Sequence, residues 1–482
     1  MEPQCFNAPR RITDVSFRDR YASLPRFARL KFFQTPKEGD TVSRMKAPNC
    51  IFTPALFIAE REVKEQIAHC GDTQMPQCFL VTLSQAEMFG QYVAWMHFRY
   101  YTEMKKTIGE RALEAHRKLK GKIELKAKAP LRSRDDLSLF YTPGVGAVSS
   151  YVAKHKKEMG EYTIKSNTIG VISDGSAVLG LGNIGPEGAL PVMEGKAMIF
   201  KEFAGLDAFP IVLATQDVEE IIATVKNIAP VFGGINLEDI SAPRCFEIEE
   251  RLKKELDIPV MHDDQHGTAI VVLAALINAF KVVKKSLLKS TVVISGAGAA
   301  GTAIANLLRR VGAGNIIVLD SKGIIETSRS GLSPHKKKLA QFTNKKKIKG
   351  GLAEALRGAD AIIGVSGPGL MNASHVRLMA KKPIVFALAN PTPEILPSEA
   401  LRGGAAVIGT GRSDFPNQIN NALVFPGIFR GALTNKVKKI TDAMKVKAAL
   451  NLAALVKYPR ADFIIPNVFD KHVVPAIAKA IK

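Results

Sequence analysis

The chain of 482 residues carries 67 Lys and Arg against 45 Asp and Glu, which gives a formal net charge of +22 at pH 7. This length favours two or three domains and a core that needs neither disulfides nor a structural metal. The five cysteines are few and show no zinc-binding spacing, so the sequence favours reduced thiols in a cytoplasmic protein, with organelle targeting left open.

The positive charge leaves nucleic-acid binding as a weaker alternative. Aromatic residues make up only 7% of the chain and do not interleave with the lysine runs at 336–338 and 345–347. These runs are therefore interpreted as solvated surface, or as a field that draws in anionic ligands. No uninterrupted apolar run reaches the roughly 18 residues of a membrane span. The longest candidate, 268–280, is interpreted as a buried helix, and no membrane partner is expected.

The first half of the chain divides into two regions of different texture. Residues 1–102 show no helical or strand period and are interpreted as an N-terminal extension of unknown role. Residues 103–258 are more regular and are expected to form the first domain. Their apolar spacing predicts one buried strand over 168–173. It also predicts three helices, over 110–120, 218–228 and 245–256.

From 259 to 482, short apolar strands alternate with helices, and this region is expected to form the second domain. The strands are predicted over 292–295, 316–320, 361–365, 383–389 and 406–409. Such alternation is typical of a parallel sheet covered by helices. The sequence therefore predicts an α/β fold with two lobes, of which the second is doubly wound.

A glycine-rich turn joins the first of these strands to an Ala- and Leu-rich helix. The turn reads G-x-G-x-x-G and consists of Gly296, Ala297, Gly298, Ala299, Ala300 and Gly301. Its glycines permit a tight turn, backbone approach to a pyrophosphate, and close packing of helix on strand. The free N–H groups at the start of the helix suit phosphate oxygens. The second lobe is therefore predicted to be a Rossmann-type NAD(P)-binding domain.

The choice between NAD and NADP stays open in the sequence. Asp320 ends the next strand, 19 residues past Gly301, where a carboxylate accepts hydrogen bonds from a ribose 2′-hydroxyl and favours NAD. Ser321 and Lys322 follow directly, and the lysines at 336–338 are near enough in sequence to reach a 2′-phosphate, which favours NADP.

Two acidic pairs stand where predicted strands end, ahead of the dinucleotide region. Glu238 and Asp239 follow one apolar stretch, and Asp263 and Asp264 follow the next. Carboxylates at the ends of strands can converge in a cleft, and Mg²⁺ or Mn²⁺ prefers such oxygen ligands. Taken together, the two pairs favour a divalent-cation site, whereas either alone would be typical of a helix cap or ion pair.

Two further residues could move protons. Lys196 precedes an apolar helical segment, and burial or a cationic neighbour could lower its pKa enough for it to act as a base. Tyr141 stands beside Pro143 and Gly144 on a turn that could direct its hydroxyl into a cleft. Each residue alone is more typical of a solvated lysine or a packing tyrosine. His266 has no set of zinc-ligand partners and is interpreted as a structural residue or as one that supports a metal ligand.

Several long motifs, in this order along the chain, resemble the short, mainly microbial branch of the malic enzymes. They are DLSLFYTPGVG at 136–146, the stretch from SDGSAVLG to GLDAFPI at 173–211, INLEDISAPRCFEIE at 235–249 and PVMHDDQHGTAIV at 259–271. The resemblance runs from about residue 103 to the C terminus. It implies oxidative decarboxylation of (S)-malate to pyruvate and CO₂, reduction of NAD or NADP, dependence on Mg²⁺ or Mn²⁺, and a homodimer or higher homo-oligomer.

The resemblance also implies roles for single residues. Lys196 would remove the proton of the C2 hydroxyl with the help of Asp263, and Tyr141 would protonate C3 of the enol. The cation would be held by three carboxylates, those of Glu238, Asp239 and Asp264.

On the nucleotide side, the resemblance implies contacts to both substrate and coenzyme. Asn390 and Asn421 match positions that hold the substrate carboxylate, and Asn390 also borders the coenzyme. Ser366 lies in the stretch 364–371 that resembles the lining of the nicotinamide side. Residues after Asp174 and Gly175 lack the arginine of the long-chain branch, so no substrate arginine is expected there.

Two alternatives compete with this interpretation. A metal-free dehydrogenase of similar plan, such as an amino-acid dehydrogenase, would have no use for the acidic pairs. A catalytically silent basic binding protein on a dehydrogenase scaffold would have no physical reason to keep Lys196, Tyr141 and the acidic pairs together.

Overall fold

The computed structural model describes residues 107–178 and 180–482, and residues 107–482 form one compact unit. The extension predicted at 1–102 lies outside the described residues. Two parallel sheets, each with its own helices, make up the unit. The α/β class and the Rossmann-type second lobe predicted from the sequence are confirmed.

The first sheet has four parallel strands in the order β2-β1-β3-β4. The strands are β1 (Thr168–Ser173), β2 (Asp207–Val212), β3 (Gly234–Leu237) and β4 (Val260–His262). The connecting helices are α8 (Gly185–Ala204), α9 (Val218–Ile228) and α10 (Arg244–Glu255). Every residue of β1, β3 and β4 is buried, as expected for parallel strands covered on both faces.

The second sheet has the order β10-β9-β8-β5-β6-β7, in which only β7 runs antiparallel. The strands are β5 (Thr291–Ser295), β6 (Asn315–Asp320), β7 (Gly323–Ile324), β8 (Ala361–Gly364), β9 (Ile384–Ala387) and β10 (Val407–Thr410). The strand order reverses between β5 and β8, which are neighbours in the sheet. In open α/β sheets such a reversal leaves a crevice at the carboxyl ends of the strands, where ligands bind.

The helices of the second lobe are mostly short. They are α12 (Ala299–Arg310), α13 (Pro334–Ala340), α14 (Leu352–Leu356), α15 (Ala373–Arg377) and α16 (Pro397–Arg402). Single 3₁₀ turns occur at η2 (Lys156–Glu158), η3 (Ile164–Asn167), η4 (Ala229–Val231), η5 (Leu287–Lys289) and η6 (Asn421–Leu423).

A long helix, α11 (Asp263–Val283), joins the two sheets and packs on α12 and on α18 (Asp442–Ala454). It contains the apolar segment predicted as a buried helix. Of the helices in the described residues, α11 is long and apolar enough to cross a membrane, but 72% of its most apolar window is buried in the fold. This burial identifies α11 as a core helix.

The C-terminal part of the chain returns to the first sheet. Helix α17 (Phe425–Thr434) packs on α8, where the ring centroid of Phe425 lies 4.7 Å from that of Phe200 and the centroid of Phe429 lies 5.6 Å from it. Helix α19 (Val473–Ala478) covers α17 in turn. One apolar core therefore includes residues of both lobes. The domain division at 258 and 259 stays a prediction, and β4, just beyond it, pairs with the first sheet.

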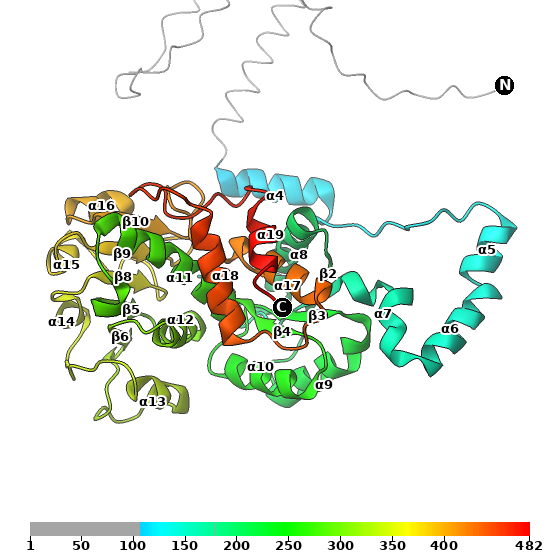
Figure 1. The fold of residues 1–482 in the computed structure, drawn as a ribbon, viewed down its shortest axis with the longest axis horizontal. Helices are drawn as coiled ribbons and strands as arrows, with labels where there is room; N and C mark the ends of the chain where they lie inside the picture. The colour runs from blue at the N-terminus through cyan, green and yellow to red at the C-terminus, as the bar shows by residue number, and fades with distance from the viewer. Residues whose placement is uncertain (1–106, 179) are drawn as a thin grey trace, which may run out of the picture. The chain divides into compact units, whose positions relative to one another are not determined.

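The first described residues form an arm of helices: α4 (Ile108–Leu119), α5 (Arg134–Phe140), α6 (Gly144–Lys154) and α7 (Met159–Tyr162). Helices α5 and α6 pack mainly on each other and stand apart from β1–β4 in Figure 1. Neither helix buries a residue fully, and large apolar side chains such as Leu139 and Phe140 are exposed.

The remaining predicted elements agree with the structure. The predicted helices correspond to α4, α9 and α10, the strand at 168–173 is β1, and the five later strands are β5, β6, β8, β9 and β10. Boundaries differ by one or two residues.

Candidate active site

The two acidic pairs meet at the carboxyl edge of the first sheet. Glu238 and Asp239 follow β3, and Asp264 is the second residue of α11, directly after β4. Because β3 and β4 are adjacent and parallel, their ends lie side by side. One carboxylate oxygen from each of the three residues lies within 4.8 Å of the others. The convergence expected from the sequence is thus present, whereas the identity of a bound ion stays a prediction.

The backbone at Asp239 holds this arrangement. Asp239 adopts a left-handed conformation with φ of 54°, which Asp tolerates better than most residues. In this conformation its N–H donates to Oδ2 of Asp264 at 2.8 Å, and its carbonyl accepts from the N–H of Ala177 at 2.9 Å. The turn after β3 is therefore joined both to α11 and to the loop after β1.

Lys196, on α8, projects into the same carboxylates. Its Nζ lies 2.9 Å from Oε1 of Glu238, donates to Asp263, and lies 4.3 Å from the ring centre of Phe425. Burial acts to lower the pKa of Lys196, as expected from the sequence. The carboxylates of Asp263, Glu238 and Asp264 outweigh burial, however, and the pKa is raised above its ordinary value. The amine of Lys196 is therefore cationic beside these carboxylates. The expectation from the sequence that the pKa of Lys196 is lowered is thus wrong for this arrangement.

The carboxylates themselves are short of positive charge. Burial raises the pKa of Glu238 to about 7, that of Asp263 to about 7 and that of Asp264 to about 6, against the opposing effect of Lys196. Four clustered carboxylates, including that of Asp239, face one lysine. A divalent cation would supply the missing charge, and a set of three carboxylates is the oxygen donor set that Mg²⁺ or Mn²⁺ takes. The residues therefore fit such an ion.

A glycine that the sequence analysis did not single out makes room for this cluster. A Cβ on Gly267 would lie 1.8 Å from Oδ1 of Asp263 and 3.1 Å from Cβ of Asn421. Asn421, at the start of η6, therefore approaches the same turn of α11 as Asp263. Asp263, predicted to assist the base, and Asn421, predicted to contact the substrate, are thereby brought together from segments far apart in sequence.

Asn390 reaches the first lobe from the other side. It follows β9, and its carbonyl oxygen would lie 2.0 Å from a Cβ placed on Gly180, in the loop after β1. The loops that carry Asn390 and Gly180 are thus in contact across the two lobes. This contact agrees with a position for Asn390 at the border of substrate and coenzyme, which stays a prediction.

Tyr141 is not brought to this cluster. It lies at the junction of α5 and α6 with a residue exposure of 65%, whereas Lys196 is buried on α8. The sequence placed Tyr141 correctly on a turn but could not show that the turn belongs to a projecting arm. Within one chain, therefore, the predicted acid and the predicted base stand apart.

The glycine-rich turn has the geometry that its pattern predicted. Gly296 has φ of 118°, and a Cβ there would lie 2.4 Å from the carbonyl oxygen of Val365. A Cβ on Gly301 would lie 1.8 Å from the carbonyl oxygen of Gly296, whereas one on Gly298 would meet no atom within 4 Å. Helix α12 begins at Ala299. Of the three glycines, Gly298 is therefore the one whose backbone is open to a ligand, beside the start of the helix.

A cavity of about 910 Å³ adjoins this turn. Its lining includes Gly296, Gly298, Asp320 and Ser366, which come from the ends of neighbouring strands of the second sheet. Ala299 and Ala300 form the first turn of α12 behind it. The hydroxyl of Ser366 lies 3.2 Å from that of Ser295. The cavity thus gathers four of the eight predicted coenzyme-binding residues at the crevice where the strand order reverses, whereas Ala299, Ala300, Gly301 and Asn390 are not among the residues that line it.

Asp320 is already engaged with cations. It binds Arg329, and its Oδ2 accepts from Nζ of Lys336 at 2.7 Å. Burial acts to raise the pKa of Asp320, but the hydrogen bonds from Arg329 and Lys336 lower it to about 2. Arg329 was missed in the sequence, since it stands nine residues away without a motif. Asp320, which favours NAD, and the cations that could favour NADP therefore lie together at one end of the cavity.

Glu394, also missed, fixes two of the loops that border the cavity. It is fully buried and accepts hydrogen bonds from the N–H of Ser366 at 3.0 Å and from that of Ala389 at 3.1 Å. Burial raises its pKa. The loops after β8 and β9 are thereby tied together beneath Ser366 and Asn390.

The histidines near the acidic pairs have structural partners. Nε2 of His266 lies 2.9 Å from Oε2 of Glu249, and Nδ1 of His262 lies 3.2 Å from the amide of Gln265. Burial lowers the pKa of both histidines to about 4, so both are neutral. The structural interpretation of His266 agrees with these contacts.

A doubly wound lobe with this dinucleotide turn, following a lobe with a buried lysine and carboxylates, belongs to a nicotinamide-dependent oxidoreductase. Residues 120–253 match the malic enzyme N-terminal domain, and residues 265–481 match the malic enzyme NAD-binding domain. The chain belongs to the malic enzyme family.

Individual relatives agree with this assignment. The chain is 53% identical over 378 residues to a bifunctional malic/malolactic enzyme of Bacillus subtilis (strain 168). This alignment covers 78% of this chain and 92% of that protein. It is 55% identical over 363 residues to an NAD-dependent malic enzyme of Geobacillus stearothermophilus, with 75% and 76% covered. The solved NAD-dependent malic enzyme of Thermotoga maritima superposes with a TM-score of 0.75 at 48% identity, covering 77% and 98%.

Proposed function

We propose that this chain oxidises (S)-malate with NAD or NADP, and that it decarboxylates the product to pyruvate with the help of Mg²⁺ or Mn²⁺. The observation that carries the proposal is the contact of the buried Lys196 amine with the carboxylates of Glu238 and Asp263, beside a second lobe with a dinucleotide turn. A metal-free amino-acid dehydrogenase would have no use for three converging carboxylates, and a silent binding protein would have no use for the buried lysine.

The residues of the cluster divide into ligands and proton carriers. Glu238, Asp239 and Asp264 would hold the cation, which when bound stabilises negative charge on substrate oxygens as a Lewis acid. With Glu238 and Asp264 engaged as ligands, Lys196 would keep Asp263 as its close partner, and its burial would then favour the neutral amine. The neutral amine removes the proton of the C2 hydroxyl, and Asp263 holds the amine in place.

The coenzyme cavity supplies the second half of the reaction. The first turn of α12 would bind the pyrophosphate, and a bound nicotinamide would supply the acceptor for the hydride of C2. Ser366 and Asn390, whose loops Glu394 ties together, would position the nicotinamide and the substrate. Asn421, close to Asp263, would bind a substrate carboxylate.

Tyr141 is proposed as the acid that protonates C3, and its exposed position gives a reason for the proposed homodimer. The arm of α5 and α6 carries exposed apolar side chains, including Leu137, Leu139 and Phe140, next to Tyr141. Burying these side chains against a second copy would be favourable, and it would place Tyr141 in a protein environment where a phenol can donate a proton. Small-molecule malate and a second copy of the chain are therefore the proposed partners.

The test is a spectrophotometric assay with malate and Mn²⁺, run with each nicotinamide in turn. The Lys196→Ala variant should lose coenzyme reduction by about a thousandfold or more, because no other described group replaces the base. Lys201→Ala is the matched control, since Lys201 lies on the same helix with its side chain 59% exposed and should leave activity unchanged. Normal turnover by Lys196→Ala would remove the assignment of the base, and activity that survives EDTA would support the metal-free alternative.

A further inference from the structure

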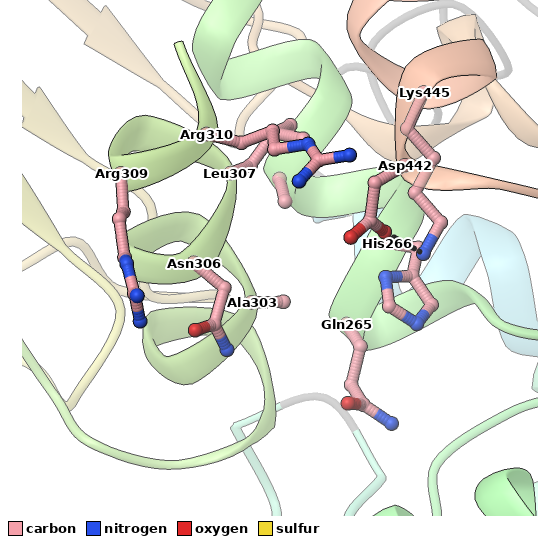
Figure 2. Close-up of a pocket in the computed structure, with 10 residues that line it drawn as sticks. Gln265, His266, Ala303, Asn306, Leu307, Arg309, Arg310, Asp442 and Lys445 are labelled. Carbon is pink, nitrogen blue, oxygen red and sulfur yellow. Dashed lines mark hydrogen bonds and ion pairs between the residues drawn. The ribbon is translucent and has the colours of Figure 1, made fainter. Parts of the chain in front are cut away.

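A second pocket, separate from the coenzyme cavity, lies between α11, α12 and α18. Its volume is about 490 Å³. Polar side chains line it from all three helices, namely Gln265 and His266, Asn306 and Arg310, and Asp442 and Lys445. In Figure 2 the side chains of Asn306 and Arg310 face Asp442 and Lys445 across a gap, with His266 and Gln265 beside it. None of these residues has a part in the proposed reaction.

Lys445 places a buried ammonium group in this pocket. The residue is 5% exposed, and its Nζ pairs with Oδ1 of Asp442 at 3.1 Å, whose side chain is 62% exposed. A carboxylate so open to water compensates a buried charge only weakly. The buried carboxylate of Glu249 attracts Lys445, but Glu249 already accepts from His266 at 2.9 Å and from Lys253 at 2.7 Å. Lys445 therefore shares its buried counter-charge with two other groups.

Further positive charge borders the same space. Arg310 lies in the last turn of α12 and is exposed on the pocket side, opposite Asp442. Asp442 and Lys445 belong to the first turn of α18, a helix of 13 residues whose N-terminal end carries a partial positive charge. Arg309 is engaged elsewhere, since its guanidinium stacks on Phe342 with 4.7 Å to the ring centre. The pocket thus offers two cations, one exposed acid and the amides of Gln265 and Asn306.

We propose that this pocket is an effector site that binds a small organic anion, with its phosphate or carboxylate groups between Arg310 and Lys445. An arginine and a lysine about an amide-lined pocket give the charge-assisted hydrogen bonds that such oxyanions require. Asp442 opposes the anion, so it keeps the affinity moderate. The volume admits a metabolite larger than inorganic phosphate.

The pocket is linked to the metal site through the first turn of α11. Gln265 and His266, which line the pocket, directly follow Asp264 in that turn. Gln265 and His266 also share Glu249 of α10 as an acceptor, at 3.3 Å and 2.9 Å. An anion that bonds to Gln265 would act on the same turn that carries Asp264. This part of the proposal rests on the proposed function of Asp264 as a metal ligand, and coupling between the two sites must be reciprocal.

The binding test uses calorimetry on the full-length protein in EDTA, so that the result does not depend on the metal site or on catalysis. The probes are glucose 6-phosphate, whose only anionic group is a phosphate, and tricarballylate, whose anionic groups are all carboxylates. At least one probe should bind in the millimolar range or tighter. Arg310→Gln and Lys445→Met should each weaken binding about tenfold, whereas Asp442→Asn should strengthen it several-fold. Lys447→Met is the matched control, because Lys447 is an exposed lysine of α18 outside the pocket.

Arg310→Gln keeps the test informative if burial makes the Lys445 variant unstable, since Arg310 is exposed. Absence of binding by both probes, or equal binding by wild type and Arg310→Gln, would overturn the site. The effector role is tested separately by titrating Mn²⁺ with and without a saturating probe. A changed Mn²⁺ affinity is expected, and an identical one would overturn the coupling. A chain that failed to oxidise malate would contradict the proposed function and leave the EDTA binding result unchanged.

Discussion

Lowering the pH from 8 to 6 should weaken binding of Mn²⁺ at Glu238, Asp239 and Asp264 by about tenfold or more. A cation that binds these carboxylates must first displace their protons. Burial raises the pKa of Glu238 to about 7 and that of Asp264 to about 6, which brings both protonations into this pH range. Ordinary exposed carboxylates would remain ionised throughout.

The magnitude follows from the ionised fractions. At pH 6, a carboxyl group with a pKa of about 7 is ionised in about one molecule in eleven, so Glu238 alone limits the competent state to roughly 9% of the protein. At pH 8 Glu238 is ionised in about 90% of molecules. The ratio of the two populations gives the expected change in affinity.

The same protonations affect stability with a defined sign. In the folded protein the pKa of Glu238 and of Asp264 is raised above the value of an unfolded chain, so the folded state holds more protons. The contribution of these protonations to the stability of the ion-free protein is therefore fully present at low pH. It is lost as the pH rises through about 7. A bound cation removes this loss, so added Mn²⁺ should raise the melting temperature more at pH 8 than at pH 6.

The assay is calorimetric titration of Mn²⁺ into EDTA-stripped, dialysed protein at pH 6, 7 and 8, with melting temperatures measured in parallel. Glu249→Gln is not a suitable control because Glu249 supports α11, whereas Glu247→Gln removes an exposed acid of the same helix and should leave the pH dependence unchanged. An affinity that changes by less than about threefold between pH 6 and pH 8 would refute the argument that buried, proton-binding carboxylates form the site.

Three further predictions concern single residues. Asp320→Ala should shift preference toward NADP by about tenfold or more in kcat/KM, because its two cationic partners become free to bind a 2′-phosphate; an unchanged ratio of NADP to NAD activity would contradict this. Gly301→Ala should weaken coenzyme binding about tenfold or more, measured by nicotinamide fluorescence, because its Cβ would fall 1.8 Å from the carbonyl oxygen of Gly296; wild-type affinity would show that the turn can adjust. Tyr141→Phe should slow conversion of added enolpyruvate to pyruvate about a hundredfold while it leaves Mn²⁺ affinity unchanged, and a normal rate would exclude Tyr141 as the acid.

The sequence was informative where local pattern and chemistry coincide. Continuous β-branched runs predicted β1, β5 and β6, because parallel strands buried on both faces need apolar side chains at every position. Acids placed directly after such runs could be expected to meet, since neighbouring parallel strands end at one edge. Glu238 and Asp264 are an example, brought together across 26 residues of sequence.

Other features depended on contacts that no local pattern shows. Arg329 pairs with Asp320, and Glu394 ties two loops, only because of how the second sheet is assembled. The raised pKa of Lys196 arises from carboxylates that come from two separate segments, the turn after β3 and the first turn of α11. The projection of the arm that carries Tyr141 was hidden for the same reason, since a turn predicts a change of direction but not what lies beside it.

The return of α17 to α8 constrains the order in which the chain can be built. The ring of Phe200 packs against the rings of Phe425 and Phe429, which leave the ribosome when most of the polypeptide has already been synthesised. Until then the half-made first lobe presents an uncovered apolar surface to the cell. Nascent chains should therefore require a holding chaperone during translation, and a fragment that stops before Phe425 should aggregate rather than fold.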